Sequence, residues 1–231
     1  MNDPNLVFVD VDTQRDFLDP DGALSVPRAD EIVANLERLS RVARERGITV
    51  VATACAHSED DEEFQRFPPH CLAGTRGQER VAATRCEPSL ILDAGETTLP
   101  AELPRHVTIL KKEFDVFSNP ITEPIVARLK AADPLFVVYG VATDYCVAAV
   151  VEGLLARGCR VALVVDAVRA IDPVQEAQLL TEYARRGVLL TQTDWVCQTA
   201  GGTAADGSCG EAGMPRPGGA GTTESSQQRD P

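Results

Sequence analysis

The chain has 231 residues, of which 44% are hydrophobic, and this is enough apolar material for one or two globular domains. Its formal net charge of −13 argues against a nucleic-acid partner, because phosphate contacts need clustered lysine and arginine. No segment approaches the ~20 apolar residues that span a bilayer, and the first residues, MNDPNLVF, lack the pattern of a secretory signal. Seven cysteines at irregular spacing indicate reduced thiols, so we expect a cytoplasmic protein with no membrane partner.

Apolar strands alternate with amphipathic helices through most of the chain. Helices are predicted over residues 29–47, 121–132, 144–158 and 172–187. Because the strands between them are continuously apolar, they indicate a mostly parallel sheet with helices on both faces, a three-layer α/β/α fold. The six predicted strands are Leu6 to Val9, Ile48 to Ala54, Val107 to Leu110, Leu135 to Gly140, Arg160 to Ala167 and Val188 to Gln192.

The composition changes near Ala200. The remaining residues are mostly Gly, Ala, Ser, Thr and Pro, with almost no side chain to bury. Such a segment cannot offset the entropy lost on ordering, so it is predicted to be disordered. We therefore expect one domain over residues 1–198 and a disordered tail over 199–231.

Three aspartates, Asp10, Asp12 and Asp16, lie where the first strand ends, in the segment FVDVDTQRDF. In parallel sheets, ligands bind beyond the carboxyl ends of the strands. An Asp-x-Asp pair there could hold magnesium for phosphoryl transfer. One carboxylate could instead serve a nucleophile from another segment, or the aspartates could be only a polar strand end.

Cys146 follows the strand that ends at Gly140, in the first turn of a helix that Asp144 can cap. A helix N-terminus stabilises a thiolate and lowers the pKa of the thiol. Its free N–H groups could also hold an oxyanion. Cys146 is therefore a candidate nucleophile, and the alternative is a small buried apolar side chain.

A lysine pair, Lys111 and Lys112, follows the strand that ends at Leu110. A lysine beside the thiol would stabilise a thiolate, although a solvated pair at a loop edge is the simpler interpretation. Cys55, His57 and His70 lie around an acidic loop after the second strand. One cysteine and two histidines leave a fourth position open, as in a catalytic zinc site, unless the histidines are only loop residues.

Four segments occur in an order that resembles a known family: VDTQRDF, FPPHCLAGTRGQE, LKKEFDVF and GVATDYCV. The chain is similar over nearly all of Leu6 to Gln192 to the isochorismatase-like cysteine hydrolases, and most similar to their nicotinamidase branch. The rival phosphoryl-transfer motif requires Thr or Val two places after its second Asp, where Gln14 stands.

The resemblance implies a role for each candidate. It makes Cys146 the nucleophile, Asp12 the general base, and Lys111, not Lys112, the third catalytic residue. It also implies a cis peptide between Val141 and Ala142. The backbone N–H groups of Ala142 and Cys146 would hold the oxyanion, and Phe17, Phe67 and Tyr145 would line the substrate pocket.

The resemblance also implies a metal, but one ligand differs. Nicotinamidases have Asp-x-His where this chain has Cys55-Ala56-His57, and their second histidine corresponds to His70. The expected ligands are thus Cys55, His57 and His70, with Glu63 as a further candidate. A thiolate makes the ligand set softer, which favours zinc over manganese or magnesium.

The function that the resemblance implies is hydrolysis of a small carboxamide, with nicotinamide as the best candidate, to the acid and ammonia. One alternative is another amidase or ureide hydrolase of the superfamily. A second is a hydrolytically silent homologue that binds a ligand or performs thiol redox chemistry. The expected partner is a small amide, and the sequence leaves open whether the chain forms a homo-oligomer.

Overall fold

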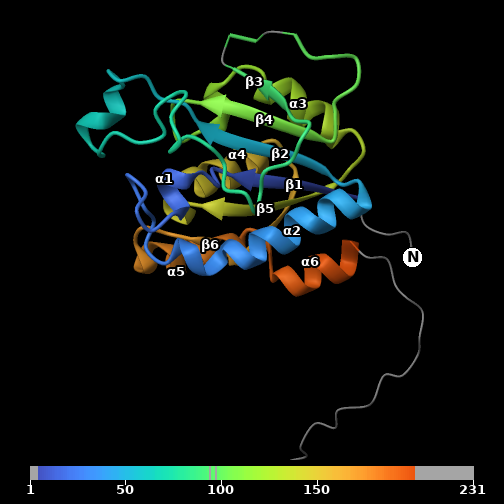
Figure 1. The fold of residues 1–231 in the computed structure, drawn as a ribbon. Helices are drawn as coiled ribbons and strands as arrows, with labels where there is room; N and C mark the ends of the chain where they lie inside the picture. The colour runs from blue at the N-terminus through green and yellow to red at the C-terminus, as the bar shows by residue number, and fades with distance from the viewer. Residues whose placement is uncertain (1–4, 94, 97, 201–231) are drawn as a thin grey trace, which may run out of the picture.

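In the computed structural model, seven parallel strands form one sheet in the order β3-β4-β2-β1-β5-β6-β7 (Figure 1). The described residues are 5–93, 95, 96 and 98–200. The strands are β1 (Leu6–Val11), β2 (Thr49–Cys55), β3 (Leu90–Leu92), β4 (His106–Lys111), β5 (Leu135–Val141), β6 (Arg160–Arg169) and β7 (Leu189–Thr191).

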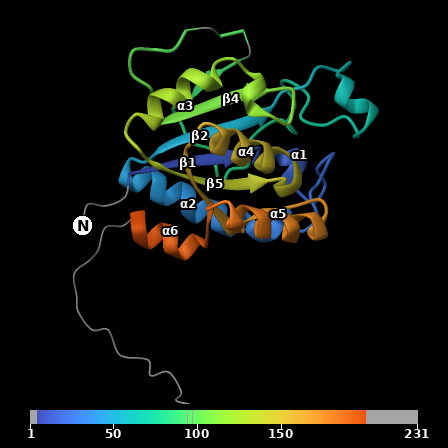
Figure 2. The same ribbon diagram turned by 180° about the vertical axis from the view of Figure 1, so that it is seen from behind.

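Helices cover both faces of this sheet, as Figures 1 and 2 show from opposite sides. The alternation along β1 assigns the two faces, because Leu6 and Phe8 belong to one buried cluster and Val7 and Val9 to the other. The first cluster includes side chains of α1 (Arg15–Leu18), α2 (Val33–Arg46) and α6 (Thr193–Ala200). The second includes side chains of α3 (Thr122–Lys130), α4 (Ala148–Ala156) and α5 (Pro173–Arg185).

The predicted three-layer α/β/α fold is therefore confirmed, with one strand more than the six predicted. The strand that was not predicted is β3, which pairs with β4 as the outermost strand of the sheet. It has only three residues, and Ile91 at its centre is 62% exposed. A run this short carries no usable periodicity, so its pairing depends on β4 and not on a local pattern.

The first long helix follows its sequence pattern closely. A 3-10 turn (Ala29–Ile32) leads into α2. The apolar side chains on one face of this segment are fully buried: Ile32, Leu36, Leu39 and Ala43. The helix ends at Gly47, which has φ 63° and accommodates the left-handed cap without a side-chain clash. At 14 residues α2 is the longest described helix, and no helix among the described residues is long and apolar enough to cross a membrane.

The last helix, α6, was not expected from the sequence. It packs on α2, and its Val196 is fully buried. The helix continues through Ala200, so it includes the first two residues of the predicted tail. Residues 201–231 of that tail lie outside the described residues.

Close contact between β1 and β5 shapes the end of the sheet where the candidate residues lie. Gly140 pairs with Val11 and has φ 114°. A Cβ atom at residue 140 would lie 2.0 Å from the carbonyl oxygen of Val11. Only glycine therefore lets the two strands meet with this spacing.

We expect Gly140→Ala to destabilise the fold by more than the control substitution Gly187→Ala. Gly187 also has a positive φ, 86°, but a Cβ there meets no atom within 4 Å. The control should therefore lose only the ~1–2 kcal/mol of left-handed strain, and Gly140→Ala a further ~1–3 kcal/mol from overpacking. Urea unfolding of both variants measures the difference, and equal losses would contradict the role assigned to the Val11 contact.

Candidate active site

Four neighbouring strands bring the candidate residues together at their carboxyl ends. Strands β4, β2, β1 and β5 are adjacent, and their arrowheads in Figure 1 point to the same edge. Lys111 is the last residue of β4, and Cys55 is the last of β2. Asp12 follows β1 directly, and Cys146 lies in the turn after β5. Parallel pairing thus places residues from four distant segments side by side.

The centre of this group is an ion pair between Lys111 and Asp12. Lys111 Nζ lies 2.8 Å from Asp12 Oδ2, and both side chains are 0% exposed. Lys111 Nζ also donates to the sulfur of Cys146, at 3.4 Å. The structure therefore brings together the three residues that were predicted to be catalytic. Lys112 is exposed, which agrees with the choice of Lys111 over Lys112.

Burial and contacts control the protonation of this group. Burial disfavours the charged form of Lys111, but Asp12 and the two nearby thiols outweigh it, so the pKa of Lys111 is raised well above its ordinary value. The pKa of Cys146 is also raised, first by a hydrogen bond with Cys55 and then by burial. This direction is opposite to the lowered thiol pKa that the sequence led us to expect.

Two further side chains position the site, and sequence analysis did not single them out. The hydroxyl of Thr53 donates to Asp12 Oδ1 at 2.5 Å, and the backbone N–H of Asp12 donates to the same hydroxyl. The side-chain amide of Gln14 bonds both the N–H and the carbonyl of Cys55, at 2.7 and 2.8 Å. A threonine two residues before Cys55 in an apolar strand was the available signal for Thr53.

The other two aspartates have structural contacts. Asp10 is buried in β1, forms an ion pair with Arg80 and accepts a hydrogen bond from Thr13. Asp16 accepts from the backbone N–H of Cys71 at 2.6 Å and so holds the segment that carries His70. Of the three aspartates, only Asp12 contacts both the lysine and a cysteine sulfur.

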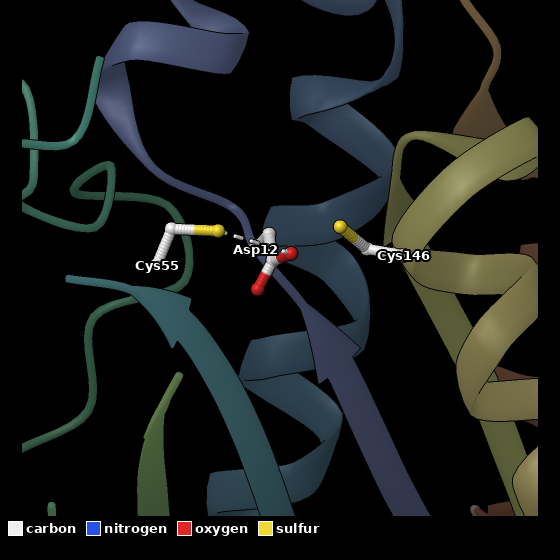
Figure 3. A group of neighbouring side chains, drawn as sticks. All are labelled: Asp12, Cys55 and Cys146. Atoms are coloured by element: carbon white, nitrogen blue, oxygen red, sulfur yellow. Dashed lines mark hydrogen bonds between the residues drawn. The ribbon is translucent and has the colours of Figure 1, made fainter. Parts of the chain in front are cut away.

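Cys55 lies beside Lys111 and Asp12. Its sulfur accepts from Lys111 Nζ at 3.2 Å and lies 3.7 Å from Asp12 Oδ2. Figure 3 shows the sulfurs of Cys55 and Cys146 approaching from opposite sides of Asp12. The ligand atoms of these three residues all lie within 4.8 Å of one another.

A second cluster contains His57, Glu63 and His70, with one ligand atom of each within 4.8 Å of the others. Nε2 of His57 is buried without a hydrogen-bond partner. Nδ1 of His70 lies 2.9 Å from the carbonyl of Pro68, which can only accept, so the proton is on Nδ1 and the lone pair on Nε2. Burial lowers the pKa of His70 and raises that of Glu63. The sulfur of Cys55 is not part of this cluster.

The two clusters differ in how well they suit a resident metal ion. Two neutral imidazoles and a carboxylate, with an unpartnered buried nitrogen, match the donor set of a transition-metal site. In the other cluster, the positively charged ammonium group of Lys111 already contacts the side chains of Asp12, Cys55 and Cys146. The histidine cluster is therefore the better fit for a resident divalent cation.

A small apolar cavity of about 30 Å³ joins the two clusters. Cys55 and Cys146 line it together with Glu63 and His70. The rings of Phe67, Phe114 and Tyr145 contact one another edge to face, with centroids 5.2 to 6.1 Å apart. All three residues predicted to line a pocket do so, and sequence analysis missed four more: Leu24, Val26, Phe114 and Ile171.

The turn before Cys146 has unusual backbone geometry. The peptide bond Val141–Ala142 is cis, as the resemblance implied. Residues Thr143–Val147 form a single π-helical turn before α4 begins. Asp144 does not cap this helix. Its carboxylate instead accepts from the N–H groups of Ile171 and Asp172, which ties the turn to the loop after β6.

Comparison with known proteins supports a single family. The pyrazinamidase of Pyrococcus horikoshii, solved in complex with zinc, is 30% identical, with a TM-score of 0.66 over 82% of this chain and 99% of that chain. A nicotinamidase of Bacillus subtilis is 22% identical, with a TM-score of 0.67 over 81% and 99% of the two chains. The N-carbamoylsarcosine amidase of Thermoplasma acidophilum is 24% identical, with a TM-score of 0.65 over 82% and 97%.

No curated protein matched the chain. The isochorismatase domain model, in contrast, matches residues 6–194, which include every candidate residue of both clusters. On this match the chain belongs to the isochorismatase family of hydrolases.

Proposed function

We propose that this protein hydrolyses a small carboxamide, with nicotinamide as the best candidate, to the acid and ammonia through a thioester. The observation that carries the proposal is the buried set of Lys111, Asp12 and Cys146 beside an apolar cavity. A thiol nucleophile and a carboxylate base that both contact one ammonium group are the parts that acyl transfer to sulfur requires.

Asp12 acts as the general base. Because the free Cys146 thiol has a raised pKa, it must lose its proton as the sulfur attacks the amide carbon. Asp12 takes this proton and delivers it to the departing ammonia. The thioester then reacts with water: Asp12 takes a proton from that water as the oxygen attacks, the carbon–sulfur bond breaks, and Asp12 returns the proton to the departing sulfur of Cys146. Thr53 holds the other carboxylate oxygen, so the base has a fixed orientation.

Lys111 and the turn at residue 142 stabilise the developing negative charge. The ammonium group donates toward the Cys146 sulfur and favours the thiolate as it forms. The backbone N–H groups of Ala142 and Cys146 are proposed to hold the oxyanion. Neither role requires a further charged side chain in the cavity.

The apolar lining favours a flat ring as the substrate body. Phe17, Phe67 and Tyr145 are proposed to contact this ring. A cavity of about 30 Å³ has room for water but not for a ring, so the side chains that line it must move apart when substrate enters. Phe67 and Phe114 come from loops and are the natural side chains to move.

A divalent cation, with zinc as the best candidate, is proposed at His57, Glu63 and His70. The carbonyl of Pro68 fixes the tautomer of His70, and Asp61 lies 3.0 Å from Nδ1 of His57. An ion held there supplies an electrophilic anchor for a lone pair of the substrate. The zinc in the structure of the 30% identical pyrazinamidase supports this choice.

The described cysteines are all free, which supports the proposal of a reducing, cytoplasmic location. The test of the function is ammonia release from nicotinamide, pyrazinamide and N-carbamoylsarcosine by the zinc-loaded protein. Release from nicotinamide is expected. Release from N-carbamoylsarcosine alone would move the assignment to a ureide hydrolase, and no release from any would favour a hydrolytically silent homologue.

We expect Asp12→Asn to lower amide turnover by ~10²–10⁴, the usual contribution of a general base. Asp10→Asn is the matched control, because Asp10 contacts Arg80 and not the catalytic group. It should keep most of its turnover but lose up to about 3 kcal/mol of stability, since Arg80 is left with an unpaired, mostly buried charge. The reverse order of turnover losses would disprove the assignment of the base.

Metal analysis of purified variants tests the ligand set. We expect His57→Ala and His70→Ala to lose bound zinc, because each removes one of three donors. Glu63→Gln should bind zinc more weakly, because it replaces a charged carboxylate with a neutral amide oxygen. Cys55→Ala should keep the metal, since its sulfur faces Lys111. Loss of zinc from Cys55→Ala would instead make Cys55 the ligand that the sequence predicted.

A further inference from the structure

Two cysteine sulfurs face the same buried space in the catalytic centre, and the proposed hydrolysis uses only one. Cys55 ends β2 and Cys146 lies in the turn after β5, so the two lie on either side of β1, and both line the cavity. Their sulfurs and a carboxylate oxygen of Asp12 lie within 4.8 Å of one another. In Figure 3 the two sulfurs approach across Asp12.

We infer that Asp12, Cys55 and Cys146 form a second cation site, which takes a soft, thiophilic divalent ion and blocks the nucleophile. This site is distinct from the histidine cluster, which has no sulfur donor. A soft ion such as Cd²⁺, or Zn²⁺ in excess, prefers thiolate ligands, whereas magnesium and calcium prefer several oxygen atoms.

The distances suit such an ion with little movement. Zinc–sulfur bonds are ~2.3 Å and the ion is usually tetrahedral, so one ion holds two sulfurs ~3.8 Å apart. The sulfurs of Cys55 and Cys146 are no more than 4.8 Å apart. Small side-chain rotations therefore bring both within bonding distance, and a carboxylate oxygen of Asp12 can complete the set. The shared cavity has room for an entering ion, because its volume of about 30 Å³ is above the ~10–15 Å³ that one water molecule needs.

The exchange is balanced in charge. Before binding, the carboxylate of Asp12 and the ammonium of Lys111 cancel, and the two thiols are neutral. Binding forms two metal–sulfur bonds and breaks two S–H bonds: M²⁺ + 2 RSH gives M(SR)₂ and two protons, which leave to solvent. The net charge of the buried group stays at zero, so binding adds no uncompensated charge to the interior.

Lys111 can stay in place during this exchange. Its ammonium group keeps the hydrogen bonds to Asp12 Oδ2, at 2.8 Å, and to the carbonyl of Glu113, at 3.1 Å. It gives up only the two weaker contacts to the sulfurs, at 3.2 and 3.4 Å. The two thiolates add negative charge near the ammonium group and so offset its repulsion with the ion.

The test is titration with Cd²⁺ under a phosphine reductant, following the ultraviolet sulfur-to-cadmium charge-transfer band and the number of bound ions. The wild-type protein should show a band for two thiolates on one ion. Cys55→Ser and Cys146→Ser should each lose at least about half of the band and weaken this binding at least about tenfold. Circular dichroism of each variant confirms that it is folded.

Two controls separate this site from the others. Cys159→Ser removes a buried cysteine that does not line the cavity, and the band should not change. His57→Ala should lose one bound ion but keep the band. A band that survives in Cys146→Ser and disappears in His57→Ala would overturn the inference, because Cys55 would then serve the histidine cluster.

The binding test uses no substrate, so it stands whether or not the proposed function is correct. If the protein is an amidase, as proposed, excess Cd²⁺ should also stop turnover, and a chelator should restore it. Cys55→Ala, which removes one of the two sulfurs, should need at least about ten times more Cd²⁺ for the same fractional inhibition. Unchanged sensitivity in that variant, with its thiolate band lost, would show that the ion acts elsewhere.

Discussion

The charge of Lys111 is the constraint on which the rest of the site depends. A buried ammonium group is tolerated only when an anion and further acceptors surround it, and losing its partner costs ~3–5 kcal/mol. Asp12 is that partner, and the two side chains are supplied by β4 and the end of β1, which are separated by β2 in the sheet. The register of these strands therefore fixes the ion pair of Lys111 and Asp12, and Thr53 and Gln14 hold the ends of β1 and β2 in that register.

The same lysine links the two thiols. Lys111 has three N–H groups, but four acceptors lie within reach: Asp12, Cys55, Cys146 and the carbonyl of Glu113. One acceptor must therefore share an N–H group with another or receive none. Hydrogen bonds to charged acceptors are roughly twice as strong as those to neutral ones. If Cys146 becomes a thiolate, as proposed, it can accept the Lys111 N–H group that otherwise points to the Cys55 sulfur. Cys55 is then the weaker of two competing acceptors.

Local patterns were sufficient for most of the fold, whereas the candidate set of Asp12, Lys111 and Cys146 came from the family resemblance. The apolar face of α2 and its glycine stop have strong periodic signals, and the order of the strand ends follows from a parallel sheet. The assignment of Asp12 over Asp10 came from the family resemblance, and the contacts of Asp10 with Arg80 give its physical basis. β3 could not be predicted, because three residues at a sheet edge acquire their conformation from β4. The raised pKa of Cys146 could not be predicted either, since it arises from Cys55, a residue 91 positions away in sequence.

Cys55 illustrates how spacing can mislead where a strand ends. In an extended chain, residues 55 and 57 would point to the same side. However, β2 ends at Cys55, and the backbone of His57 then pairs with Cys71 and Ala73 instead of the sheet. The thiol therefore remains with the lysine while the imidazole joins Glu63 and His70. The change of direction sorts the donors by chemical softness: nitrogen and oxygen atoms lie in one cluster, and both sulfurs lie in the other. The resident cation proposed at the histidines and the inhibitory one proposed at the thiols can then be distinguished by the class of ion that each accepts.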